Sequence, residues 1–296
     1  MKKLFSILAG ILAVGSASAQ NDMNTYTYKL GEATVTLLSE GQQQGNGSIL
    51  IGATPEMTAK YIPDNTFPNA SNAFLIRTPD KNILIDTGFG RRLFDNLQSS
   101  GVTPEEIDIL LITHMHGDHI GGMLRNGEAA FPNAELYLPQ PEYDYWTSTT
   151  EMNRLPENKR GNFLNAQQVI TAYKEKLHLF QPVEIGTSAT PLLPGIQGIA
   201  AYGHTPGHTL YMVESGNDKL LIWADLTHAM AIQMPCPQVA VTYDIDPEKA
   251  IASRKKVLKY VAENHIPIAG MHIAFPGIGN ISENTAGSYV FTPANE

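Results

Sequence analysis

Short apolar runs recur along the chain, and longer segments with apolar residues on one side alternate with them. The short runs are rich in Ile, Leu and Val, and Gly, Pro, Asn or Asp residues bound many of them. Such runs predict β-strands, here over residues 34–38, 72–77, 83–86, 109–113, 135–138, 196–201, 211–214, 220–223 and 268–271. Three of the runs are nearly continuous hydrophobes, which indicates strands covered on both faces.

The longer segments predict helices over residues 91–99, 140–147, 166–176 and 247–264. The last has the clearest signals, because Asp246 can cap it and Pro247 stands at its first position. Its apolar stripe runs from Ala250 to Val261, and we expect its Lys and Arg residues on the opposite face. Strands mixed with covering helices predict an α/β layered fold.

The organisation of the chain follows from its ends and its least regular segment. Lys2 and Lys3, the apolar stretch 4–15 and the small residues 17–19 are typical of a signal peptide over residues 1–19, with an uncleaved membrane anchor as the alternative. We therefore expect export to the periplasm or the outside, and no membrane association after cleavage. No linker divides residues 20–296, which we expect to form one domain, although two fused halves also suit this length. Residues 41–67 are polar and punctuated by Gly and Pro, which predicts a surface arm or lid.

Composition narrows the function classes. The 296 residues include 29 acidic and 20 basic side chains, for a formal net charge of −9. Nucleic-acid binders usually have a basic excess, so this balance argues against that class. Cys236 is the one cysteine of the sequence, which excludes an internal disulfide and a zinc site with several thiolate ligands.

The sharpest chemical feature is the stretch Thr113-His114-Met115-His116-Gly117-Asp118-His119, which follows an apolar run. Alternate spacing puts His114 and His116 on one side of an extended segment. Imidazole and carboxylate groups are ligands that suit zinc and similar divalent ions. The motif therefore predicts ligands for two neighbouring cations, and a polar turn with chance histidines is the alternative.

Three downstream pieces carry further candidate ligands. Two histidines flank the rigid turn Gly203-His204-Thr205-Pro206-Gly207-His208, Asp225 ends one apolar run and His272 ends another. Each piece alone could be a cap or a hydrogen-bonding group. Together they predict two coordination shells with about three protein ligands per metal plus water, as in catalytic sites.

The order of these motifs resembles the metallo-β-lactamase superfamily. The resemblance includes Asp86 in the stretch 84–88 and covers nearly the whole chain after the predicted signal. It implies an αββα sandwich, two mixed sheets packed face to face with outer helices and a binuclear site at one edge. It also implies a ligand set: His114, His116 and His208 for the first metal, Asp118, His119 and His272 for the second, and Asp225 between them. Asp86 resembles an acid that orients ligands, and we expect His204 to support His208.

Within that superfamily the chain looks closest to the methyl-parathion-hydrolase-like and lactonase-like enzymes. Zinc β-lactamases of the best-known type have Cys where Asp225 stands, and glyoxalase II proteins have His at the position of Met115. The resemblance implies an exported dinuclear hydrolase of lactones, carboxyl or aryl esters, or organophosphate triesters. A zinc β-lactamase and a metal-dependent binding protein without turnover are the alternatives.

The expected mechanism uses a hydroxide bridging two divalent ions, by default Zn²⁺, with manganese, iron or cobalt also compatible with these ligands. Asp118 and Asp225 are the predicted catalytic carboxylates, with Asp118 also relaying a proton. The pocket candidates are Phe67, Trp146, Phe163 and His228, with core packing as the alternative for the aromatics. We expect a small neutral ester or lactone as substrate, and the arm 41–67 could cover the partner in a homodimer.

Overall fold

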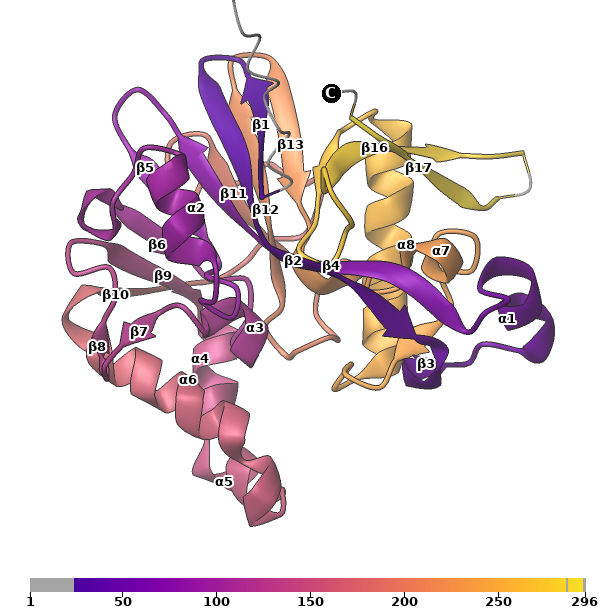
Figure 1. Ribbon diagram of the computed structural model, residues 1–296, viewed down its shortest axis with the longest axis horizontal. Helices are drawn as coiled ribbons and strands as arrows, with labels where there is room; N and C mark the ends of the chain where they lie inside the picture. Colours follow the sequence, from indigo (N-terminus) through magenta and orange to yellow (C-terminus); the bar gives the residue numbers. More distant parts are fainter. Residues whose placement is uncertain (1–23, 286, 295–296) are drawn as a thin grey trace, which may run out of the picture.

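Two β-sheets face each other at the centre of the computed structural model, which describes residues 24–285 and 287–294 (Figure 1). The predicted signal peptide lies outside the described residues. The seven-stranded sheet has the order β1-β2-β4-β5-β6-β9-β10. Its strands are β1 (Thr25–Leu30), β2 (Ala33–Asn46), β4 (Thr66–Arg77), β5 (Asn82–Ile85), β6 (Ile109–Leu111), β9 (Glu135–Pro139) and β10 (Leu177–Phe180).

The six-stranded sheet has the order β11-β12-β13-β15-β16-β17. Its strands are β11 (Ile196–Ala200), β12 (Thr209–Ser215), β13 (Asp218–Ile222), β15 (Ile268–Ala269), β16 (Ile278–Glu283) and β17 (Tyr289–Pro293). Strands β5, β6, β9 and β10 pair in parallel, as do β13 and β15. The carboxyl ends of parallel neighbours meet at one edge of a sheet, which is where ligands bind in such folds.

Three hydrophobic clusters define the layers. The first lies between the sheets and joins residues such as Leu37 and Phe74 of one sheet to Tyr211 and Ile222 of the other. The second covers the outer face of the seven-stranded sheet with α2 (Leu93–Ser99), α4 (Gln140–Thr147) and α6 (Gly161–Ala172). The third packs α8 (Pro247–Glu263) on the outer face of the six-stranded sheet. The αββα sandwich that the sequence implies is therefore the observed fold.

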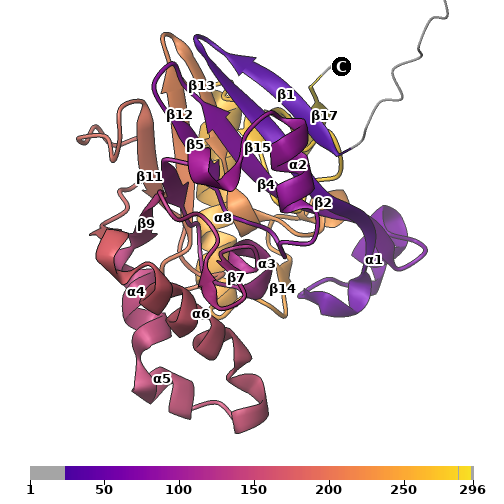
Figure 2. The ribbon, with the colours of Figure 1, turned by 60° about the vertical axis from the view of Figure 1, so that its left-hand side comes forward.

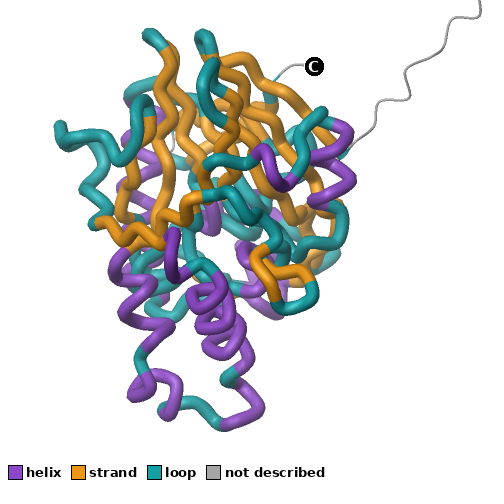
Figure 3. Tube along the Cα trace, turned by 90° about the vertical axis from the view of Figure 1, so that its left-hand side faces the viewer, coloured by secondary structure: helices purple, strands orange, loops and turns teal. Residues whose placement is uncertain are grey.

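The views from other directions agree with this layering. In Figure 2 α2 lies in front of the strands and α8 lies behind them. The helices of residues 140–172 project from one end of the strands in Figures 2 and 3. The remaining short elements are α1 (Pro55–Tyr61), α3 (Gly117–Ile120), α5 (Thr149–Asn153), α7 (Met230–Gln233), β3 (Leu50–Ile51), β7 (Leu124–Arg125), β8 (Glu128–Ala129) and β14 (Ala240–Val241). None of the helices in the described part of the chain is both long and apolar enough to cross a membrane.

The predicted arm over residues 41–67 is mostly regular structure. Strand β2 continues to Asn46 and β4 begins at Thr66, so the two form a long ribbon that carries α1 and β3 (Figure 1). The ribbon is attached to the rest of the molecule, because β3 pairs with β14 and Phe67 is buried against Ile232 and Val239. The polar composition of this segment concealed its strands.

The predicted elements differ from the observed ones mainly at their ends. The helix 140–147 coincides with α4, whereas the predicted helix 166–176 begins five residues earlier as α6 and ends at Ala172. Strands β1, β10, β16 and β17 were not predicted. The prediction for α8 was wrong about Arg254, which lies on the buried face of the helix and is only 1 % exposed.

The guanidinium of Arg254 fastens α8 to the chain that follows β13. Its Nε donates to the carbonyl of Leu226 at 2.8 Å, and its Nη1 donates to the carbonyls of Pro237 at 3.0 Å and Val239 at 2.7 Å. Its Nη2 lies 3.9 Å from Oδ2 of Asp244. Buried carbonyls and a buried carboxylate without donors would cost free energy, so this side chain holds the segment that carries Asp225 and Asp244.

The substitution Arg254→Ala should lower the free energy of unfolding by about 3–5 kcal/mol. It removes the side-chain donor of the carbonyls of Leu226 and Pro237, one of two donors to the carbonyl of Val239, and the positive charge beside the buried Asp244. Urea unfolding followed by circular dichroism would measure the change. The exposed neighbour Lys255 supplies the control, since Lys255→Ala should change stability by less than about 0.5 kcal/mol. Equal unfolding midpoints for the two variants would contradict this role of Arg254.

Candidate metal centre

The candidate ligands gather where strands of both sheets end. His114 and His116 follow β6, His204 follows β11, and Asp225 follows β13 in the short 3-10 helix Ala224–Leu226. His272 follows β15 in the same way. Four chain segments far apart in the sequence therefore bring imidazoles and carboxylates to one edge of the sandwich.

One cluster contains three histidines and Asp225. The Nε2 of His114 lies 3.1 Å from Nδ1 of His116, which lies 3.0 Å from Nε2 of His204. The Nε2 of His204 is in turn 3.2 Å from Oδ2 of Asp225. All four donor atoms lie within 4.8 Å of one another, so one divalent cation could contact all of them.

A second cluster adjoins the first and contains Asp118, His119 and His272. The Oδ2 of Asp118 lies 3.8 Å from Nε2 of His119 and 3.7 Å from Nε2 of His272. Asp225 reaches this cluster as well, with Oδ1 at 3.0 Å from Nε2 of His119 and Oδ2 at 3.1 Å from Nε2 of His272. The carboxylate of Asp225 therefore faces both clusters, as the sequence resemblance implies.

The structure exchanges the predicted roles of His204 and His208. Both ring nitrogens of His208 are engaged by the backbone: Nδ1 donates to the carbonyl of Ala201 at 2.9 Å, and Nε2 accepts from the N–H of Asp225 at 3.1 Å. No lone pair is left for a cation, so the prediction of His208 as a ligand was wrong. His204, predicted as its support, instead presents Nε2 to the first cluster. The two histidines flank one turn, and spacing alone could not decide between them.

In most histidines of the two clusters, the ring nitrogen that points away from the cluster has a hydrogen-bond partner. Nδ1 of His119 lies 2.6 Å from Oδ2 of Asp86, as expected for an orienting acid. Nδ1 of His204 lies 2.9 Å from Oδ1 of Asp244, and Nδ1 of His272 donates to the carbonyl of Ala70 at 2.9 Å. Such partners fix the ring orientation of ligating histidines. Sequence reasoning missed the role of Asp244, since it lies 40 residues after His204 and no local motif connects them.

Burial and the mixture of charges set the protonation states. Burial lowers the pKa of His116 to about 3, and it lowers the pKa of His114 well below its ordinary value. Burial opposes ionisation of Asp225, but the charges of His119 and His272 hold its pKa well below the usual range. Burial likewise opposes protonation of His204, yet hydrogen bonds to Asp225 and Asp244 raise its pKa to about 9. The buried carboxylate therefore attracts positive charge from its surroundings.

Two buried atoms of the centre are suited to a cation. Within the described residues, Nε2 of His119 and Oδ1 of Asp225 are buried and have no hydrogen-bond partner of proper geometry. Unpaired buried polar atoms are costly, and such an atom calls for a partner. A divalent ion between imidazole nitrogens and carboxylate oxygens would satisfy both atoms with the donor types that zinc prefers. The residues present therefore fit the metal ions that the motif predicts.

A cavity of about 720 Å³ opens onto the two clusters. Its wall includes His116, Asp118, His204, Asp225, His228 and His272, together with the carboxamides of Gln43, Gln44, Asn46, Asn69 and Asn162. Among the described residues that line it, none is Lys or Arg. The ribbon formed by β2 and β4 thus supplies much of the wall. Ile49, Phe89 and Tyr243 add apolar surface, and away from the clusters the described wall residues carry no charge.

The four predicted pocket residues have different positions. His228 lines the cavity and places Nε2 3.0 Å from Oδ2 of Asp225, and its donor atoms also group with those of Asp225 and His272. Phe67, Trp146 and Phe163 were wrongly assigned to the wall, because each is at most 3 % exposed and packs in a hydrophobic cluster. Large aromatic side chains gain more from full burial than from a partly wet wall.

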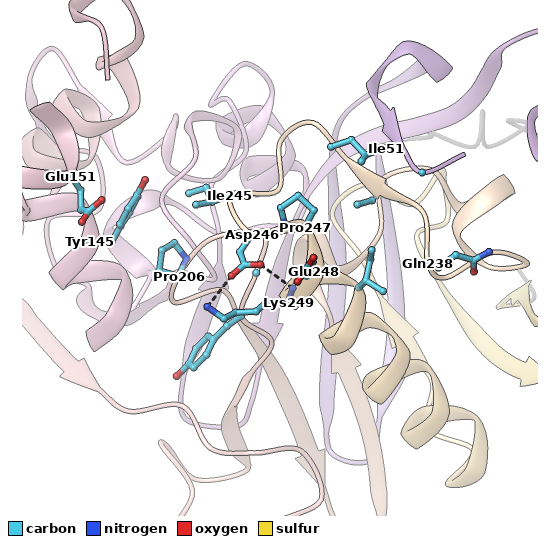
Figure 4. Close-up of a pocket in the computed structure, with 15 residues that line it drawn as sticks. Ile51, Tyr145, Glu151, Pro206, Gln238, Ile245, Asp246, Pro247, Glu248 and Lys249 are labelled. Carbon is cyan, nitrogen blue, oxygen red and sulfur yellow. Dashed lines mark hydrogen bonds and ion pairs between the residues drawn. The ribbon is translucent and has the colours of Figure 1, made fainter. Parts of the chain in front are cut away.

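A second hollow, of about 890 Å³, lies beside the turn that carries His204 (Figure 4). Gly203 and Pro206 of that turn form part of its wall, as does the start of α8. The close-up shows an ion pair between Asp246 and Lys249 there, at 2.8 Å. Because no member of the two clusters lines this hollow, it is separate from the metal centre.

Comparisons with known proteins agree with this architecture. The crystal structure of hydrolase AbOPH in the beta lactamase superfamily has a TM-score of 0.81 and 29 % identity, over 92 % of this chain and 98 % of that one. AidC, described as a dizinc quorum-quenching lactonase in complex with a product, has a TM-score of 0.82 and 27 % identity over the same shares. The anti-Pycsar protein Apyc1 of Paenibacillus sp. (strain J14) is 28 % identical over 60 % of this chain, which spans 66 % of that relative's length.

The sequence profile of the Metallo-beta-lactamase superfamily matches residues 66–265, which is more than half of the chain. That range contains both histidine motifs, Asp225 and most of the two sheets. The chain therefore belongs to the metallo-β-lactamase superfamily of hydrolases and carries a His/Asp cluster suited to divalent metal ions.

Proposed function

We propose that this chain is a dinuclear metallohydrolase that opens lactones and cleaves other small neutral esters. The position of Asp225 carries the proposal, because one buried carboxylate faces two groups of ligands. The similarity to AidC supports a lactone as substrate, since AidC is described as a dizinc lactonase. We further propose that residues 1–19 direct export and that the mature chain forms a homodimer through the arm 41–67.

The side chains divide the work of such a reaction among them. Two divalent cations, by default Zn²⁺, would supply Lewis-acid activation of water and of the scissile carbonyl. Asp225 fixes the separation of the two clusters. Asp118 is the more exposed carboxylate of the centre, with a side chain 26 % exposed, and it can accept a proton from the attacking water and pass it to the leaving oxygen. Burial opposes its ionisation, but the charges of His119 and His272 lower its pKa, so it is available as a base.

The cavity wall favours uncharged substrates. The carboxamides of Gln43, Gln44 and Asn162 can donate and accept hydrogen bonds with ester and amide groups. An anionic substrate would meet the carboxylates of Asp118 and Asp225 without a Lys or Arg among the described wall residues. Lactones, aryl esters and phosphotriesters are neutral and meet this condition, and the panel below separates them.

A substrate panel tests the reaction class. Purified protein with added Zn²⁺ should hydrolyse an N-acyl lactone or an aryl ester at least about tenfold faster, by kcat/KM, than a phosphotriester or a penicillin. The phosphotriester has a tetrahedral centre in place of a planar acyl group, and the penicillin carries a carboxylate that would meet Asp118 and Asp225. Removal of metal with a chelator should abolish the activity, and reloading should restore it. Full activity after verified metal removal, or preference for the β-lactam, would overturn the proposed function.

The substitution Asp225→Ala should reduce kcat/KM by more than about 100-fold, because this carboxylate contacts both clusters. Loss of a residue that only orients a metal ligand costs about 10–100-fold. Steady-state kinetics on the best substrate and metal analysis of the same sample measure the effect. Glu248→Ala is the matched control, since it removes an exposed carboxylate from the separate hollow. If Glu248→Ala lost activity while Asp225→Ala kept it, the reaction would belong to the separate hollow and the proposal would be contradicted.

The corrected ligand set makes a different prediction for each of the paired histidines. His204→Ala should lose about one of two bound zinc equivalents, because Nε2 of His204 belongs to the first cluster. His208→Ala should keep both equivalents and melt at a lower temperature, because it breaks hydrogen bonds to Ala201 and Asp225. Elemental analysis measures the bound zinc, and thermal unfolding measures the melting temperature of each variant. Loss of zinc in His208→Ala with full zinc content in His204→Ala would show that His208 is the ligand.

A further inference from the structure

Glu142 on α4 is a fully buried carboxylate that belongs to neither cluster. Its Oε2 accepts hydrogen bonds from the N–H of Met115 at 3.1 Å and from Nε1 of Trp146 at 2.5 Å. Its Oε1 accepts from the N–H of Gly207 at 2.8 Å and from the hydroxyl of Thr205. Each oxygen therefore has two donors, and an ionised carboxylate is the group that accepts at both oxygens.

Three of the four donors lie in the two loops that carry the first cluster, and the fourth, Trp146, is on α4 itself. Met115 stands between His114 and His116, and Thr205 and Gly207 follow His204 in its turn. One side chain of an outer helix thus binds both loops at once. The loops come from different sheets, after β6 and β11, so no β-ladder fixes their separation. One backbone hydrogen bond, from the N–H of Thr209 to the carbonyl of Thr113 at 3.0 Å, joins them beside Glu142.

Glu142 and its helix pack closely against the turn that carries His204. A Cβ atom added at Gly207 would lie 2.3 Å from the backbone nitrogen of Glu142, so glycine is required for α4 to approach the turn this closely. The ring of Trp146 also meets His116 edge-on, with centroids 5.7 Å apart. Helix α4, the turn and the histidine loop are therefore in direct contact on several sides.

The second cluster depends on other supports. His119 is held by Asp86 and His272 by the carbonyl of Ala70, and neither contact involves Glu142. We propose that Glu142 is a positioning residue for the first cluster only, and that it sets the distance between His116 and His204 and thereby the affinity of the first cation. This inference rests on the proposed dinuclear centre.

Glu142→Gln is the informative substitution because it keeps the size of the side chain. Its amide would place an NH₂ group against either the N–H of Gly207 or the N–H groups of Met115 and Trp146, so at least one of these hydrogen bonds must break and one loop must move. Partners that orient metal ligands change metal affinity by about 10–100-fold when mutated. We expect a loss of at least about tenfold in the affinity of the first cation and less than about twofold in that of the second.

Two backgrounds isolate the cations. His272→Ala leaves only the first cluster complete, and His116→Ala leaves only the second. Zinc affinity, measured by competition with a chromophoric chelator, should fall on adding Glu142→Gln in the first background and stay unchanged in the second. Co²⁺ absorption spectra of the same proteins should change only in the first background. Equal losses in both backgrounds, or no loss in the first, would overturn the proposal.

Further variants separate positioning from simple destabilisation. Val169→Ala removes buried volume from α6 in the same layer without touching Glu142, and it should lower the melting temperature with both zinc affinities unchanged. Thr205→Val deletes one of the four donors and should weaken the first cation by a smaller factor, which gives a readout even if Glu142→Gln does not fold. A wild-type protein that binds fewer than two equivalents would refute the dinuclear proposal itself, whatever Glu142 does.

Discussion

The buried negative charge of Asp225 is the constraint on which the centre depends. Its side chain is only 2 % exposed, and imidazoles surround it: ring nitrogens of His119, His204, His228 and His272 lie within 3.0–3.2 Å of its oxygens. A charge in such a place is stable only with opposite charge close by, because desolvation is otherwise too costly. Protons on some of these histidines or divalent cations can supply that charge, and the uniform N and O donor set favours the cations.

The fold meets this constraint by bringing strand ends together from both sheets. The apolar cluster between the sheets fixes how β6 of one sheet lies against β13 and β15 of the other, and the ligands follow those strands directly. Outer helices then secure the connecting loops through buried polar contacts, Glu142 from α4 and Arg254 from α8. Both residues replace the backbone pairing that loops lack, since buried loop carbonyls and N–H groups need partners.

The sequence was sufficient for whatever depends on local order and insufficient for whatever depends on contacts between distant segments. Periodicity and end signals located α4 and α8, and strand-end position identified Asp225 and His272. Polar composition concealed the ribbon of β2 and β4, because its pairing satisfies backbone groups whatever the side chains are. Asp244 and Glu142 could not be found, since each acts on loops 27 to 65 residues away through hydrogen bonds that no spacing rule encodes.

The exchange of His204 and His208 shows why two histidines occur in one turn. His208 directly precedes β12 and is buried, and its Nε2 accepts a hydrogen bond from the N–H of Asp225. Ala224, just before Asp225, has a positive φ of 49°, a conformation that needs support from its surroundings. His208 gives that support by accepting a hydrogen bond from the backbone N–H of Asp225. His204 instead contacts the side chain of Asp225. The two histidines therefore both contact Asp225, His208 at its main chain and His204 at its side chain.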